Sequence, residues 1–162
     1  MKILGKIIDK LLPLETVYAH CDIPCGIYDP HLAQLAAHTV IRMVKLISEV
    51  KQVPPTDADT RNKMIRYVTV KEHHAEIVKH EIRILWGDYF KPEHIQQHPE
   101  LHELVWKVMK LGSKAKQEVN LESAEELLEA VNKIAEIFWK TKNIQTTRKK
   151  LYPTGKDSVV PQ

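Results

Sequence analysis

Three residues that can bind a metal ion lie close together near the start of this chain. His20, Cys21 and Cys25 bring one imidazole and two thiols into a stretch of six residues. The prolines and glycine of the surrounding segment, HCDIPCGIYDP (20–30), favour a tight irregular loop over a helix or strand. Thiolate sulfur prefers soft or borderline transition metals, and a planar set of nitrogen and sulfur donors indicates nickel or copper.

The spacing of these residues also leaves other interpretations open. Structural zinc usually takes four side-chain ligands, and an iron–sulfur cluster generally needs four as well, whereas the chain has only two cysteines. A buried or disulfide-linked pair in a surface loop would need no metal, although a bridge closing so short a loop stabilises little. The spacing alone therefore does not decide between a metal site and a plain loop.

The remainder of the chain predicts the helices that must position this loop. Asp29 and Pro30 are suited to an N-cap and a first helical position. No strand alternation competes with the helical patterns, so the predicted fold class is all-α, a four-helix bundle. Apolar residues recur at helical spacing in four stretches: Leu32, Leu35, Ala36, Val40, Met43, Val44 and Ile47; Met64, Ile65, Val68, Ala75, Val78, Ile82 and Leu85; Leu101, Leu104, Val105, Val108 and Leu111; Leu127, Leu128, Val131, Ile134 and Phe138.

Proline and glycine predict where these helices begin and end. We expect the first helix to end at Val53-Pro54-Pro55 and the second near Trp86-Gly87. The third is expected to begin at His98-Pro99 and to end before Gly112, and the fourth to begin near Leu121.

Residues 1–19 stand apart from this helical region. They end in Val17-Tyr18-Ala19, which satisfies the small-residue rule for signal-peptide cleavage. However, Asp9 and Lys10 interrupt the apolar stretch, which favours a cytoplasmic pro-segment over an export signal. No apolar run is long enough to span a membrane.

The chain is thus expected to have three parts. Residues 1–19 form the pro-segment, and residues 20–142 form one domain with the hook at 20–28. Residues 143–162 form a polar, basic tail that is expected to be mobile. The net charge of +3 is mild and gives no reason to propose nucleic acid as a partner.

Four segments resemble one known family in the order in which they occur. The hook HCDIPCGIYDP resembles the metal-binding hook of the nickel superoxide dismutases, HCxxPCGxYDP. The segment WGDYFKP (86–92) is similar to the family's WxDYFKP. PELH (99–102) and IFWKTK (137–142) resemble its PELH and IFWxTK.

This resemblance implies a function, a cofactor and a route of maturation. The family disproportionates superoxide to dioxygen and hydrogen peroxide by Ni(III)/Ni(II) cycling, with one nickel ion per subunit in a homohexamer of antiparallel four-helix bundles. A maturation protease would cleave between Ala19 and His20. The His20 amine, the Cys21 amide and the thiolates of Cys21 and Cys25 would then form a planar set, with the His20 imidazole as an axial ligand.

The resemblance also implies roles around the metal. Tyr28 and Tyr89 would flank the nickel and limit access to it. Asp22 and Pro24 would hold the shape of the hook, with Pro24 in a cis peptide. Lys91 would lie near the entrance and favour an approaching anion.

Two positions depart from the family pattern. Some members brace the axial imidazole with a glutamate and an arginine, where this chain has Ala36 and His74. His74, His73 or His38 is a candidate for a replacement contact. The alternative function is a helical protein that binds nickel or copper without turnover; a screened entrance formed by Tyr28 and WGDYFKP favours the enzyme instead.

Overall fold

The computed structural model describes residues 26–50 and 57–162, which form a helical bundle followed by a C-terminal hairpin. The helices are α2 (His31–Ser48), α3 (Ala58–Ile84), α4 (Pro92–Gln97), α5 (Leu101–Gln117) and α6 (Leu121–Thr141). A π-helical turn, η1 (Leu85–Tyr89), connects α3 toward α4. The strands are β1 (Thr146–Leu151) and β2 (Lys156–Pro161).

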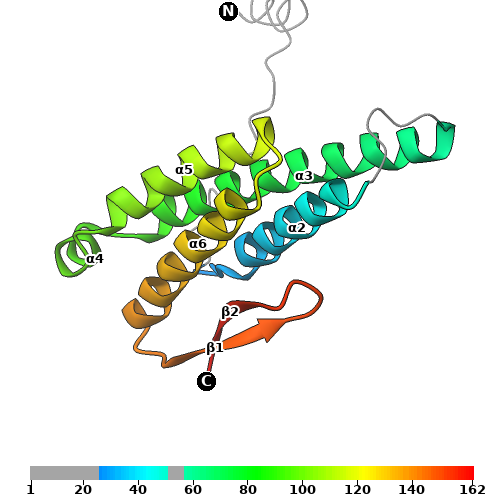
Figure 1. The fold of residues 1–162 in the computed structure, drawn as a ribbon. Coiled ribbons are helices and arrows are strands. Elements are labelled where there is room, and N and C mark those ends of the chain that lie inside the picture. The colour runs from blue at the N-terminus through cyan, green and yellow to red at the C-terminus, as the bar shows by residue number, and fades with distance from the viewer. Residues whose placement is uncertain (1–25, 51–56) are drawn as a thin grey trace, which may run out of the picture.

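The four long helices confirm the antiparallel four-helix bundle. Helix α2 contacts α3 and α6, and α5 contacts the same two helices. Successive long helices run in opposite directions (Figure 1). Their inward faces form one apolar core, whose fully buried members include Ile41, Val78, Ile82, Leu101, Leu127, Ile134 and Phe138. Within the described part of the chain, no helix is both long and apolar enough to cross a membrane.

Three of the apolar residues predicted to face the core do not do so. Leu32 and Leu35 of α2 are 48% and 45% exposed, and Ile65 of α3 is 66% exposed. Their helical spacing is correct, but the apolar stripe is wider than the surface that the neighbouring helices cover. The structure therefore leaves apolar side chains on the outside of α2.

The predicted ends of the helices need three corrections. Helix α2 ends at Ser48, before the predicted end at Val53-Pro54-Pro55. Helix α2 begins one residue later than expected, and the Asp29 carboxylate accepts a hydrogen bond from the N–H of His31 at 2.7 Å. The third long helix does not stop before Gly112 but continues to Gln117. Gly112 of α5 is buried against Lys79 of α3. A Cβ atom at position 112 would lie only 2.8 Å from the Lys79 side chain. This glycine permits a close approach of helices instead of ending one.

A buried lysine completes the C-terminal end of α5. The Lys71 ammonium donates hydrogen bonds to the carbonyls of Ala115, Lys116 and Glu118, although the residue is only 2% exposed. Burial lowers the pKa of Lys71, while the nearby Glu72 opposes that shift. A cation at this position compensates the carbonyls that a helix end leaves without partners.

Residues 143–162 were expected to form a mobile tail, and that prediction is wrong. Strands β1 and β2 pair antiparallel, from Thr146 opposite Pro161 to Leu151 opposite Lys156. At the turn, the N–H of Gly155 donates to the Leu151 carbonyl, and a φ of +70° explains the glycine. Figure 1 shows the hairpin lying beside α2 and α6.

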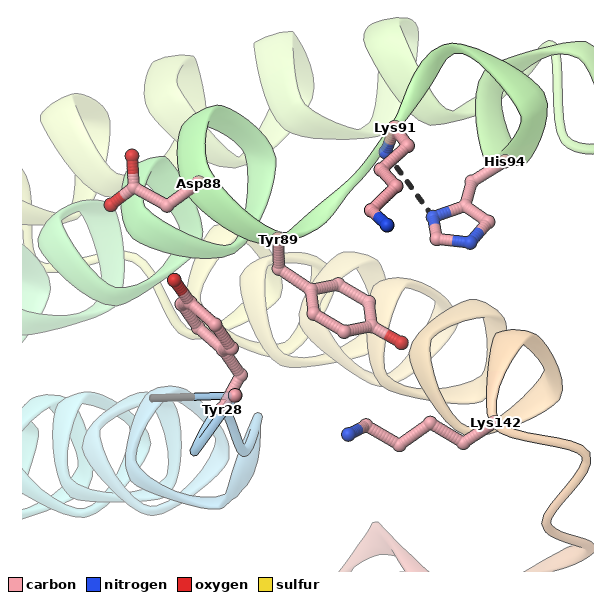
Figure 2. A pocket seen from close by; sticks show the side chains of 7 residues that line it. Tyr28, Asp88, Tyr89, Lys91, His94 and Lys142 are labelled. Atoms are coloured by element: carbon pink, nitrogen blue, oxygen red, sulfur yellow. Dashed lines mark hydrogen bonds between the residues drawn. The ribbon is translucent and has the colours of Figure 1, made fainter. Parts of the chain in front are cut away.

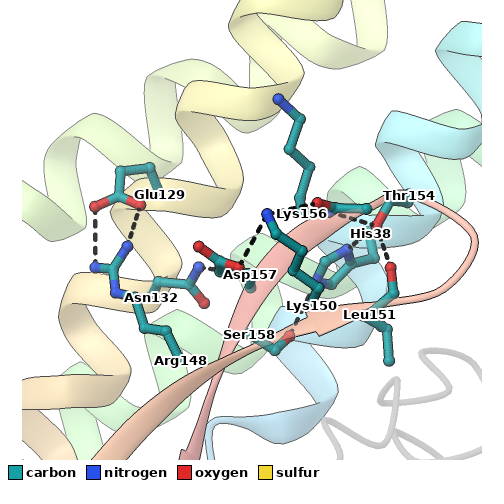
Figure 3. A network of polar contacts seen from close by, with 11 residues as sticks. His38, Glu129, Asn132, Arg148, Lys150, Leu151, Thr154, Lys156, Asp157 and Ser158 are labelled. Atoms are coloured by element: carbon teal, nitrogen blue, oxygen red, sulfur yellow. Dashed lines mark hydrogen bonds and ion pairs between the residues drawn. The ribbon is translucent and has the colours of Figure 1, made fainter.

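Polar side chains on the helices hold the hairpin in place. Gln34 donates to the Val159 carbonyl at 3.1 Å, and Asn132 donates to the Asp157 carbonyl at 2.8 Å. Arg148 of β1 forms a bidentate ion pair with Glu129, with N–O distances of 2.7 and 3.1 Å (Figure 3). Bidentate pairing of this kind gives an orientation as well as an attraction. The hairpin is therefore docked on the bundle in a defined register.

His38 of α2 lies between the turn and the second strand of the hairpin. Its Nδ1 is 2.7 Å from Thr154 Oγ1, and its Nε2 is 2.8 Å from Ser158 Oγ. Because the Thr154 hydroxyl donates its one proton to the Leu151 carbonyl, it accepts a hydrogen bond from His38 Nδ1–H. A neutral ring then accepts at Nε2 from Ser158. Burial lowers the pKa of His38, with Asp157 acting in the opposite direction.

We expect acid to weaken the docking of the hairpin through His38. The unfolded chain protonates this histidine near its ordinary pKa of about 6.5, whereas the folded chain resists protonation. Neutral His38 therefore stabilises the folded chain fully when the pH is above the pKa of the unfolded state. This contribution is lost as the pH falls through the lower pKa of the folded state. Between pH 7.5 and 5.5, the midpoint of thermal unfolding should fall more in the natural chain than in His38→Gln. Equal pH dependence in the two chains would contradict this assignment.

Candidate functional site

Residues that precede the first long helix and follow the last one line one cavity of about 450 Å³ at the end of the bundle. The segment before α2, the turn η1, the start of α4 and the residue that follows α6 all contribute (Figure 2). The lining residues are Gly26, Tyr28, Asp88, Tyr89, Lys91, His94 and Lys142. Residues separated by more than a hundred positions in the sequence therefore meet here.

The π-helical turn η1 places Tyr89 at this cavity. The N–H of Phe90 donates to the carbonyl of Leu85 at 3.0 Å, a hydrogen bond spanning five residues. This wider turn separates the end of α3 from the extended backbone of Lys91, after which Pro92 begins α4. Single π turns are frequent at functional sites.

The two tyrosines at the cavity contact each other. The ring centroids of Tyr28 and Tyr89 are 5.5 Å apart with an interplanar angle of 53°. Tyr89 also packs on Phe138, at 4.6 Å, and stacks on His94, at 5.8 Å. Both tyrosines are half-buried. Their rings form a shared apolar wall whose position is set by packing on α4 and α6.

The charged groups around the cavity favour a small anion. Lys91 and Lys142 each contribute one positive charge, and Asp88 contributes one negative charge. The Lys142 ammonium lies 5.3 Å from the centroid of the Tyr89 ring, within reach of a cation–π interaction. His94 accepts a hydrogen bond at Nδ1 from the N–H of Lys91, at 3.2 Å, so a neutral ring carries its proton at Nε2.

The structure brings together those predicted site residues that it describes. Tyr28, Tyr89 and Lys91 all line the same cavity. His20, Cys21, Asp22, Pro24 and Cys25 lie outside the described residues, so their predicted roles stay predictions. Gly26, directly after Cys25, also lines the cavity and has a φ of +71°. Gly26 and Tyr28 belong to the predicted hook (20–28), so the described end of the hook lines the cavity, and the backbone conformation of Gly26 is one that suits glycine.

Sequence reasoning missed several residues at this site. Asp88 belongs to the recognised segment WGDYFKP, which had suggested no role for it, and nothing in the local pattern separates His94 from ordinary surface residues. Lys142 ends the segment IFWKTK, which had marked the family without suggesting a role for its lysine. Only the folded chain places this lysine over the ring of Tyr89.

The histidines considered as replacement braces have different surroundings. Both ring nitrogens of His38 bond to the hairpin, so this residue is committed elsewhere. His74 donates from Nδ1 to the carbonyl of Val70 at 2.8 Å, which leaves Nε2 of a neutral ring as an acceptor. His73 is exposed and meets His74 edge to face. Ala36 is buried and offers no polar group.

Comparison with known proteins identifies the family of the chain. The family model for nickel-containing superoxide dismutase matches residues 15–142. The superoxide dismutase (Ni) of Streptomyces coelicolor is 38% identical over 130 residues, which are 80% of this chain and 93% of that protein. The corresponding protein of Streptomyces seoulensis is 40% identical with the same coverage.

Solved structures give the same result. A native nickel superoxide dismutase aligns with a TM-score of 0.68 and 35% identity, covering 76% of this chain and 99% of that one. A structure with nickel ligation of the oxidized state aligns with a TM-score of 0.68 and 36% identity, with the same coverage.

The chain belongs to the nickel-containing superoxide dismutases, a family of oxidoreductases. Family membership does not favour the alternative of a metal carrier without turnover. The matched region ends at residue 142, so the docked hairpin lies beyond the part of the chain that the family model covers.

Proposed function

We propose that this chain disproportionates superoxide at a nickel ion held by His20, Cys21 and Cys25, with the cavity as the route to that ion. One observation carries the proposal. Gly26, the residue after Cys25, lines the same cavity as Tyr89 and Lys91, which come from the other predicted motif. The hook segment and WGDYFKP therefore contribute residues to the same cavity.

The donor set suits nickel. Two thiolates and an imidazole are soft and borderline donors, in contrast to the oxygen ligands that calcium and magnesium prefer. The amine of His20 and the amide nitrogen of Cys21 would add two donors once residues 1–19 are removed. When bound, nickel supplies the one-electron oxidation and reduction that disproportionation needs.

The residues at the cavity would select and admit the substrate. Two superoxide ions and two protons give one dioxygen and one hydrogen peroxide, so the route must admit a small anion and protons. Lys91 and Lys142 outweigh the charge of Asp88 and favour approach of an anion. The tilted rings of Tyr28 and Tyr89 narrow the route, and Asp22 would hold the hook in position.

Assembly and maturation complete the proposal. We expect a cytoplasmic homohexamer, made from a precursor that a maturation protease cleaves between Ala19 and His20. Asp9 and Lys10 within the leader support a pro-segment over an export signal. The exposed Leu32 and Leu35 on α2 give this face an apolar surface of the kind that subunit contacts use.

Metal analysis of the mature chain tests this function. Protein isolated from the cells that make it should contain close to one nickel ion per chain and should consume superoxide. The metal content is measured by elemental mass spectrometry and the turnover by following superoxide decay. Stoichiometric zinc without nickel in the natively matured protein would contradict the proposal and indicate a structural site.

A further inference from the structure

The hydroxyl group of Tyr89 has a fixed partner on α6. Tyr89 Oη lies 2.5 Å from Thr141 Oγ1, at the last residue of that helix. Thr141 Oγ1 is in turn 2.7 Å from the carbonyl oxygen of Phe138, three residues earlier. The main-chain N–H of Lys142, which follows, bonds to the Trp139 carbonyl. The Tyr89 hydroxyl, the Thr141 hydroxyl and the Phe138 carbonyl thus form a short chain of hydrogen bonds.

The direction of these hydrogen bonds follows from counting protons. A carbonyl oxygen can only accept, and a threonine hydroxyl carries a single proton. Thr141 therefore donates to the Phe138 carbonyl and has only lone pairs to offer Tyr89. The phenol of Tyr89 must donate its own proton to Thr141. The tyrosine proton is then held at the helix end, and the phenol oxygen keeps only acceptor capacity for the cavity.

We propose that Thr141 is a positioning residue that makes Tyr89 a hydrogen-bond acceptor toward the cavity. In that state Tyr89 binds O–H donors, such as water and hydrogen peroxide, and offers no proton to an anion. This assignment rests on the proposed function only in taking the cavity as the path of substrate and product. Within that function, the cavity treats substrate and product differently. Lys91 and Lys142 attract the anionic substrate, whereas Tyr89 accepts a hydrogen bond from the neutral product.

Two substitutions of Thr141 test the hydrogen-bond direction without any metal. Thr141→Val removes the acceptor with little change in volume, and Thr141→Ser keeps it. The intensity ratio of the tyrosine Raman doublet, which reports whether a phenol donates or accepts a hydrogen bond, is measured on the full chain. The Tyr89→Phe chain identifies the contribution of this residue. We expect loss of the donor signature in Thr141→Val and its retention in Thr141→Ser; an unchanged spectrum in Thr141→Val would overturn the proposal.

Anion inhibition of the matured, nickel-loaded protein gives the second readout. Freed from Thr141, the Tyr89 proton can turn toward the cavity and bond an anion. Azide should therefore inhibit Thr141→Val about tenfold more strongly than Thr141→Ser, the effect of one hydrogen bond contributing ~1.4 kcal/mol. Equal or weaker inhibition in Thr141→Val would also overturn the proposal.

A matched control separates this role from a general effect on helices. Thr69 of α3 makes a similar hydroxyl bond to a backbone carbonyl, that of Ile65, at an exposed site. Thr69→Val should change neither the Raman doublet nor azide inhibition, and a change there would count against a specific role for Thr141. If the natural chain showed no superoxide turnover, the proposed function would fail, while the Raman result would still decide the hydrogen-bond direction.

Discussion

Replacing Cys21 or Cys25 by serine is expected to reduce superoxide turnover by at least about 1,000-fold. Groups that only support a metal ligand typically contribute about 10–100-fold, and here a proposed ligand itself is lost. A serine hydroxyl is a poor substitute because it does not ionise near neutral pH and is a harder donor than thiolate sulfur. Turnover is measured by following superoxide decay, alongside the nickel content of each chain.

The cysteine substitutions should leave the bundle folded. The core formed by the described residues lies mainly on α2, α3, α5 and α6, which pack on one another. The helical circular dichroism and the thermal unfolding of metal-free chains should match those of the natural sequence. A variant that is fully folded and retains turnover would show that the thiolate is not a ligand.

An N-terminus at His20 is expected to be required for activity. A chain that begins at His20 should bind nickel and turn over superoxide, whereas one with a single glycine before His20 should lose at least about 100-fold of its activity. The reason is chemical: a terminal amine has a pKa of about 7.7–8.0 and is a good donor, but an amide nitrogen at the same place is not.

A glycine added after Gln162 provides the matched control for this experiment. It changes the length of the chain by the same amount without altering the residue before His20, and should leave activity intact. The mass of the mature chain from native cells provides an independent measurement. Full activity in a chain that retains Met1 would refute the role of the His20 amine.

The four long helices could be predicted because their information is local. Apolar residues repeat with the helical period, and capping residues mark several ends. Asn120, for example, accepts from the N–H of Ser123 at the start of α6. The periodic pattern was less reliable for Leu35 and Ile65, because burial depends on which neighbour covers a face and not on spacing alone.

The hairpin could not be predicted because its support comes from elsewhere in the chain. The strand sequences TTRKKL and KDSVVP are mostly polar and show little alternation. An isolated two-stranded hairpin is marginal in water. Here Gln34, His38 and Asn132 supply the missing interactions from α2 and α6. Each of these residues alone resembles an ordinary polar position on a helix.

The functional site also has one part that the sequence predicts and another that depends on the tertiary structure. By itself the sequence determined the family and the types of the proposed donors, since His20, Cys21 and Cys25 are neighbours. Only the tertiary structure decided that Tyr28, Tyr89 and Lys142 line one cavity. It also placed Thr141, whose own proton goes to the Phe138 carbonyl, where it can accept the proton of Tyr89. Donor chemistry belongs to residue types at short spacing, whereas the direction of a hydrogen bond depends on atoms that only helix packing brings together.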